Sequence, residues 1–147
     1  MKHILIATDG SDHALKAAQF AGELAAGMNA ELHVLAVAYH DRAGEQELRE
    51  FARIENLEGG VADIVRNLAE SHADQARRQA EAQGAKAIKT SVIEGDPTEE
   101  ILAYIAAKSI DAVVVGRRGR SRLTRLLLGS VSQKLASLAP CIVIICP

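Results

Sequence analysis

Short apolar runs alternate along this chain with longer segments in which apolar residues recur at helical spacing. The runs lie at residues 4–7, 32–39, 111–116 and 141–146, and residues 86–94 alternate loosely and also read as a strand. Runs of this kind are typical of strands that are buried on both faces, as in parallel sheets. The alternation of strands with helices therefore predicts an α/β fold, in which an open parallel sheet is covered by helices on both faces.

Capping residues help to place the helices between these runs. Ser11 is a favourable N-cap for the first helix. Asp96 is another, with Pro97 at the first helical position and Glu99 placed to complete a capping box. Residues 40–59 are polar and are predicted as a loop, with a loose helix as the alternative. The four expected helices span about residues 11–27, 61–83, 97–109 and 129–138.

Length and charge restrict the class of protein. A chain of 147 residues predicts one domain, residues 1–147. The formal net charge of −2 argues against a general attraction to nucleic acid or to membranes. No apolar run approaches the roughly 20 residues that span a bilayer, and the apolar start is too short for a secretory signal.

The two cysteines indicate the redox setting. Cys141 and Cys146 share one predicted strand, in which they would lie about 16 Å apart. That separation is too long for a disulfide within the strand. We therefore expect free thiols and a reducing, cytoplasmic location.

A glycine-punctuated loop follows the fourth predicted strand. Gly116 and Gly119 are separated by two residues, and Gly129 and Ser130 follow nine residues later, at the start of a helix. Glycine permits close backbone approach, and a helix N-terminus attracts anions, so this pattern predicts a phosphate cradle. The spacing matches neither the Walker motif nor the dinucleotide fingerprint. Packing of a tight loop is the alternative explanation.

Positive charge is concentrated beside these glycines. Residues 117–125 contain five arginines and no acidic residue, whereas the rest of the chain has 12 basic and 19 acidic residues, a balance of −7. Arg118 or Arg120 could bind phosphate groups bidentately, and a solvated arginine loop is the alternative. Aromatic stacking residues do not accompany the arginines, so nucleic-acid binding is not expected.

Four segments in this order resemble the universal stress protein family over essentially the whole chain: residues 4–11, 95–97, 115–119 with 126–132, and 139–141. Members that carry the complete glycine motif tend to bind ATP. The resemblance therefore implies ATP binding, a five-stranded sheet in the order 3-2-1-4-5, and a homodimer. Arg117 departs from the family pattern, because many members have Ser or Thr at this position.

The resemblance also implies positions for the nucleotide between the first and fourth strands. Residues expected to border adenine and ribose are Ala7, Thr8 and Asp9, with an apolar contact from Val37. Residues expected to line ribose and phosphates are Val115, Gly116, Gly119, Gly129, Ser130, Val131 and Ser132.

Metal ligands are harder to assign. Asp9 could hold the Mg²⁺ that accompanies ATP, directly or through water, and Ser132 is a weaker candidate. The alternative role of Asp9 is helix capping. The five histidines show no ligand spacing, so we assign no resident metal site.

The expected function is regulatory ATP binding. The sequence offers no Walker lysine and no evident catalytic base, so no catalytic residue is assigned and slow hydrolysis is the most that we expect. A slow ATPase or phosphotransferase, and an interaction protein that does not use nucleotide, are the alternatives. AMP or cyclic AMP could replace ATP. We expect a homodimer through residues 141–146, because an apolar edge strand needs cover, together with a protein partner that the sequence does not identify.

Overall fold

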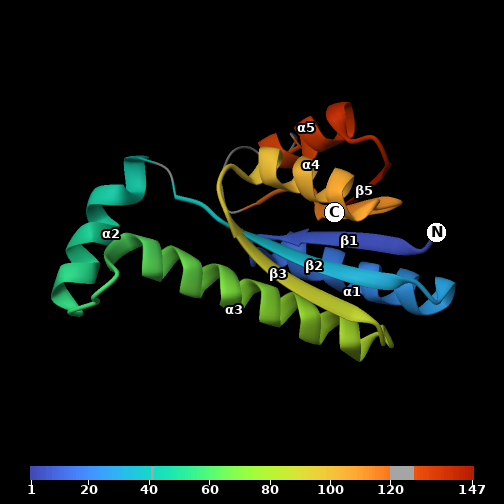
Figure 1. The fold of residues 1–147 in the computed structure, drawn as a ribbon, viewed down its shortest axis with the longest axis horizontal. Coiled ribbons are helices and arrows are strands. Elements are labelled where there is room, and N and C mark those ends of the chain that lie inside the picture. The colour runs from blue at the N-terminus through green and yellow to red at the C-terminus, as the bar shows by residue number, and fades with distance from the viewer. Residues whose placement is uncertain (41, 120–127) are drawn as a thin grey trace.

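The computed structural model describes residues 1–40, 42–119 and 128–147. Five parallel strands form one sheet in the order β3-β2-β1-β4-β5 (Figure 1). The predicted fold class and strand order are therefore confirmed. The strands are β1 (His3–Thr8), β2 (Glu31–Ala38), β3 (Ile88–Glu94), β4 (Ala112–Gly116) and β5 (Ile142–Cys146).

Helices cover both faces of the sheet. They are α1 (Asp12–Met28), α2 (Arg42–Ile54), α3 (Gly60–Ala82), α4 (Pro97–Lys108) and α5 (Ser130–Leu138). One face is covered by α1 and α3, and the other by α4 and α5 (Figure 1). None of the helices in the described residues is long and apolar enough to cross a membrane.

Small residues let the helices lie close to one another and to the sheet. The α1–α3 contact is so close that a Cβ on Gly22 would lie 2.6 Å from the carbonyl oxygen of Ala80. Four alanines of α3 are buried in the same layer, at positions 69, 73, 76 and 80. Because close-packed interiors do not tolerate added atoms, this layer depends on residues without large side chains.

The predicted caps are present. The Ser11 hydroxyl accepts a hydrogen bond from the Ala14 N–H at 3.2 Å, and an Asp96 carboxylate oxygen accepts one from the Glu99 N–H at 3.0 Å. Each cap satisfies one N–H that the first helical turn leaves without a helical partner.

The loop predicted for residues 40–59 is wrong over most of its length, because this segment contains α2. Leu48 and Ala52 of α2 face inward, and Ala52 is only 5% exposed. Glu45 and Arg49 form an ion pair one turn apart on the solvent side. Because only a few apolar side chains of α2 pack on α3, most of its residues are polar. This polar composition hid the helical periodicity of the segment from the sequence analysis.

Candidate functional site

The turn after β1 is fixed by its own side chains. Asp9 Oδ1 accepts a hydrogen bond from the Ser11 N–H at 3.0 Å, and Thr8 Oγ1 accepts one from the Gly10 N–H at 3.2 Å. Gly10 has a φ of +76°, a left-handed conformation that favours glycine. Asp9 therefore organises the entry to α1, while Ser11 caps the helix.

The loop after β4 packs directly on this turn. A Cβ on Gly116 would lie 2.7 Å from the backbone carbonyl carbon of His13, and a Cβ on Gly119 would overlap the carboxylate of Asp9. The Ser11 hydroxyl donates to the Arg118 carbonyl oxygen at 3.4 Å. Gly116 is thus required for close approach of the loop to α1, whereas a side chain at position 119 would have to displace only the Asp9 carboxylate.

The start of α5 is joined to the same loop. The Gly129 N–H donates to the Arg117 carbonyl oxygen at 2.8 Å. The Ser132 hydroxyl donates to the carbonyl oxygens of Arg117 and Gly129, at 3.1 and 3.0 Å. Ser132 is only 3% exposed. Its hydroxyl therefore holds the loop in place, and its role toward a nucleotide or Mg²⁺ stays a prediction.

Most of the predicted nucleotide residues are brought together by these contacts. Ala7 and Val115 are paired in register at the ends of β1 and β4. Val37 lies near the end of β2 and packs in the same hydrophobic cluster as Ala7 and Val131. Arg120 lies outside the described residues. We call the following group the carboxyl-edge site: Thr8, Asp9, Gly116, Arg118, Gly119 and residues 129–132.

Two features make the carboxyl-edge site suitable for an anion. Gly129 is the N-cap of α5 and has no side chain with which to cap the first turn. The N–H groups at the start of α5 therefore carry the positive end of the helix dipole. Arg118 Nε is buried and has no hydrogen-bond partner among the described residues. A buried donor of this kind is costly unless a ligand satisfies it.

A pocket of about 260 Å³ lies beyond the carboxyl ends of β2 and β3. Tyr39, His40, Glu94 and Asp96 line it, with Ala38, Ala62, Val65 and Gly95. No residue of the predicted nucleotide site belongs to this lining. Glu94 and Asp96 give this pocket two carboxylates, of which Glu94 pairs with Arg66 at 3.2 Å.

A second polar group lies at the opposite edge of the sheet and was missed by the sequence analysis. His3 and Glu31 are paired in register at the starts of β1 and β2, and His33 lies two residues after Glu31. Burial lowers the pKa of the His33 imidazole, and the neighbouring Lys89 lowers the pKa of the Glu31 carboxyl. Only strand register brings these residues together, and register was the signal that could have found them.

The strand order and the glycine-lined switch point define an open, Rossmann-like α/β protein. The sequence model of the universal stress protein family matches residues 1–147, and this chain belongs to that family.

Relatives from distant organisms match along most of their length. Universal stress protein YxiE of Bacillus subtilis is 33% identical over 143 residues, which cover 97% of this chain and 96% of YxiE. Universal stress protein MJ0531 of Methanocaldococcus jannaschii is 31% identical over 147 residues, which cover 98% of this chain and 81% of that protein.

Solved structures share the fold. Universal stress protein UspA from Lactobacillus plantarum has a TM-score of 0.78 and 27% identity, and the match covers 99% of this chain and 97% of UspA. A universal stress protein solved in complex with cAMP has a TM-score of 0.69 and 24% identity, with 99% and 97% covered. One from Archaeoglobus fulgidus in complex with dAMP has a TM-score of 0.67 and 19% identity, with 100% and 98% covered. At these last two identities the likeness shows the fold alone.

Proposed function

We propose that this chain is a regulatory module that binds an adenine nucleotide, ATP with Mg²⁺, at the carboxyl-edge site. The observation that carries the proposal is the N-terminus of α5 beside Arg118. A Cβ on the N-cap residue Gly129 would lie 3.3 Å from the Arg118 Cα, so the helix start and the arginine are adjacent. A helix N-terminus next to a guanidinium is a strong attractor of phosphate.

The remaining residues fit the rest of the nucleotide. Ala7, Val37 and Val131 offer an apolar surface of the kind that an adenine ring contacts, since all three are partly buried in one cluster. Asp9 has one carboxylate oxygen bonded to the Ser11 N–H. Its other oxygen offers an acceptor for a ribose hydroxyl or a ligand for Mg²⁺. The complexes of other family-fold proteins with cAMP and dAMP support an adenine ligand.

The role that we propose is regulation. A bound nucleotide changes the behaviour of a protein only through different affinities for two states, so ATP would favour one form over another for a protein partner. The free thiols of Cys141 and Cys146 support a reducing, cytoplasmic setting. A homodimer through β5 completes the proposal.

Isothermal titration of the untagged protein with Mg-ATP, AMP and cyclic AMP tests the site. Arg118→Gln should weaken ATP binding by at least about tenfold, because a hydrogen bond to a charged group contributes about 1.5–3 kcal/mol. AMP has fewer phosphate groups and should lose less. Arg78→Gln is the matched control, since the Arg78 side chain is 72% exposed and pairs with Asp74 on α3.

Two results would reject the proposed function. One is the absence of adenine-nucleotide binding at millimolar concentration. The other is an Arg118→Gln variant that binds ATP as tightly as the native protein, which would place the nucleotide elsewhere.

A further inference from the structure

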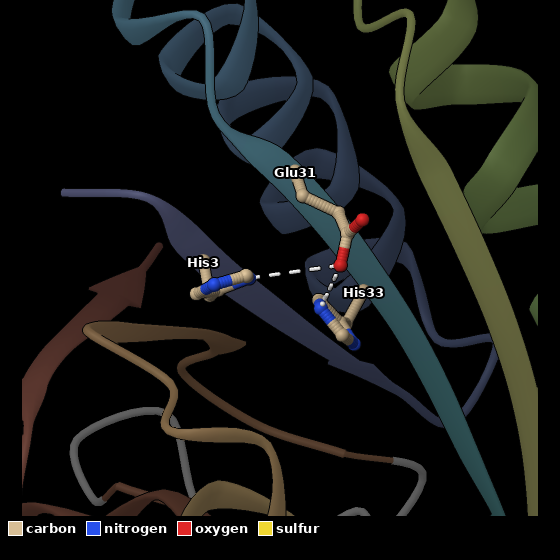
Figure 2. A group of neighbouring side chains, drawn as sticks. All are labelled: His3, Glu31 and His33. Atoms are coloured by element: carbon tan, nitrogen blue, oxygen red, sulfur yellow. Dashed lines mark ion pairs between the residues drawn. The ribbon is translucent and has the colours of Figure 1, made fainter.

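Two histidines and a glutamate converge at the amino-terminal edge of the sheet, at the other end of the strands from the carboxyl-edge site. We call His3, Glu31 and His33 the amino-edge cluster. His3 is opposite Glu31 and His33 is opposite Leu5 in the parallel β1–β2 pairing. Side chains two residues apart on a strand share a face, so the register places all three on one face (Figure 2).

The ligand atoms of the amino-edge cluster are close together. Glu31 Oε1 lies 2.8 Å from His33 Nε2 and 3.6 Å from His3 Nδ1 (Figure 2). The three ligand atoms all lie within 4.8 Å of one another. Ligand atoms about 2.0–2.2 Å from a tetrahedral zinc ion are roughly 3.3 Å apart, so small side-chain movements would complete the geometry.

Both facing imidazole nitrogens lack an ordinary hydrogen bond. His3 Nδ1 and His33 Nε2 are buried atoms with no hydrogen-bond partner among the described residues. His33 Nε2 nevertheless forms an ion-pair contact of 2.8 Å with Glu31 Oε1, and His3 Nδ1 lies 3.6 Å from the same oxygen. Buried nitrogens without aligned partners are unusual, and a cation between them and the carboxylate would satisfy all three groups.

The second nitrogen of His33 is held as a metal-binding histidine requires. His33 Nδ1 lies 2.9 Å from the Tyr104 hydroxyl, which lies 3.3 Å from the Ser91 hydroxyl. With a cation between Nε2 and Glu31, Nδ1–H would donate to the Tyr104 hydroxyl and Tyr104 to Ser91, and the Nε2 lone pair would be directed at the cation. Such outer partners fix the tautomer of metal-ligating histidines. The His33 side chain is only 4% exposed, so its position is well determined.

We propose that His3, Glu31 and His33 bind a divalent transition-metal ion such as Zn²⁺, with water completing the coordination. Two imidazoles and one carboxylate suit zinc and its first-row neighbours better than Mg²⁺ or Ca²⁺, which prefer oxygen ligands. The side chains of His3 and Glu31 are 39% and 26% exposed, so solvent and the ion have access. This site is independent of the nucleotide site.

Lys89 is the natural competitor for the carboxylate. Its Nζ lies 3.0 Å from Glu31 Oε1, and its side chain is 63% exposed on the edge strand β3. A long, exposed ammonium can turn away into solvent when an ion binds. Asp111 is the other nearby charge, and one of its carboxylate oxygens accepts the Lys2 and His3 N–H groups at 2.6 and 2.9 Å. Asp111 thus anchors the start of β1 and holds His3 at the cluster.

Cobalt titration of the untagged protein in chelator-free buffer tests the proposal, because Co²⁺ at a site of low coordination number gives a visible absorption band. The native protein should bind one Co²⁺, and Zn²⁺ should displace it. His3→Ala and Glu31→Gln should each weaken binding by at least about tenfold. Tyr104→Phe should weaken it by about 10-fold or more, as loss of an outer partner does. His40→Gln, a change at an exposed histidine elsewhere, should have no effect.

Lys89→Gln gives a test in the opposite direction, since removal of the competing ammonium should tighten Co²⁺ binding. Circular dichroism of each variant verifies that the fold is retained. His3, Glu31 and Lys89 are not fully buried, so these changes leave the core intact. The proposal is overturned if the native protein binds no Co²⁺ at 1:1 stoichiometry, if His3→Ala and Glu31→Gln bind as the native protein does, or if Lys89→Gln weakens binding.

Discussion

The Ser132 hydroxyl donates to the Arg117 carbonyl oxygen at 3.1 Å and thereby ties the first turn of α5 to the loop after β4. It also lies 3.0 Å from the Gly129 carbonyl oxygen, so one hydroxyl serves both sides of the loop. The helix start and the glycine loop meet at this residue. The shape of the carboxyl-edge site therefore depends on a side chain that is almost fully buried.

Ser132→Ala should destabilise the protein by about 1–2 kcal/mol, since it removes the donor from two carbonyl oxygens in a partly buried position. Urea denaturation followed by circular dichroism measures the change. Ser137→Ala is the matched control on the same helix, because the Ser137 hydroxyl donates to the Gln133 carbonyl oxygen at 3.2 Å on an exposed surface. If the two substitutions lower the unfolding free energy equally, the burial of the Ser132 hydrogen bonds does not add to their contribution to stability.

Gly10→Ala should be clearly more destabilising than Gly60→Ala. Both glycines have left-handed backbones, with φ values of +76° and +62°, and alanine in that region costs about 1 kcal/mol. A Cβ at Gly10 would also overlap the ring of His72, whereas a Cβ at Gly60 meets nothing within 4 Å. The difference between the unfolding free energies of Gly10→Ala and Gly60→Ala therefore measures the cost of the overlap between the new Cβ and the His72 ring.

A double-mutant cycle completes this test. His72→Ala should lower the additional cost of Gly10→Ala, because the ring that obstructs the Cβ is then absent. If Gly10→Ala and Gly60→Ala are equally costly, the close approach of His72 to the turn after β1 does not persist in solution.

The sequence predicted the fold well because the relevant signals are local. Four apolar runs and the loosely alternating residues 86–94 specified the strands, and Ser11 and Asp96 marked two helix starts through hydrogen bonds within three residues. The glycine spacing also located the loop after β4, since a missing Cβ is a property of one residue. Strand order came from the family resemblance and is confirmed by the sheet topology.

Features that depend on strand register, or on a narrow apolar face within a polar segment, were not predicted in the same way. The amino-edge cluster joins His3 to residues 28 or more positions away, and only the pairing of β1 with β2 brings them together. The helix α2 rests on α3 through few apolar side chains, so its sequence looks like a polar loop. The hydrogen bonds of Ser132 to Arg117 and Gly129 were not predicted either, because hydroxyl direction depends on the fold of the loop.

Both cysteine thiols should react slowly with iodoacetamide at pH 8 and rapidly after unfolding in denaturant. Burial raises the pKa of Cys141 and of Cys146, so each has a smaller thiolate fraction at this pH than an exposed thiol. The rates should increase as the pH is raised. Cys146 is only 8% exposed and should react after Cys141. Mass spectrometry of timed samples measures the order, and labelling of Cys146 first would contradict the packing of β5.

The protein should be a dimer at micromolar concentration, with β5 at its interface. The sheet has two edge strands, and they differ in character: β3 carries the exposed charges of Lys89 and Glu94, whereas β5 carries Ile142, which is 55% exposed. Charged edges resist strand pairing and apolar edges favour it, so two copies are expected to pair through β5.

Light scattering after size exclusion should give a dimer for the native protein and a monomer for Ile142→Lys. Phe20→Lys, at an apolar residue of α1 that is 41% exposed, should remain dimeric. A native monomer would exclude this interface, and a dimeric Ile142→Lys variant would locate it on another surface.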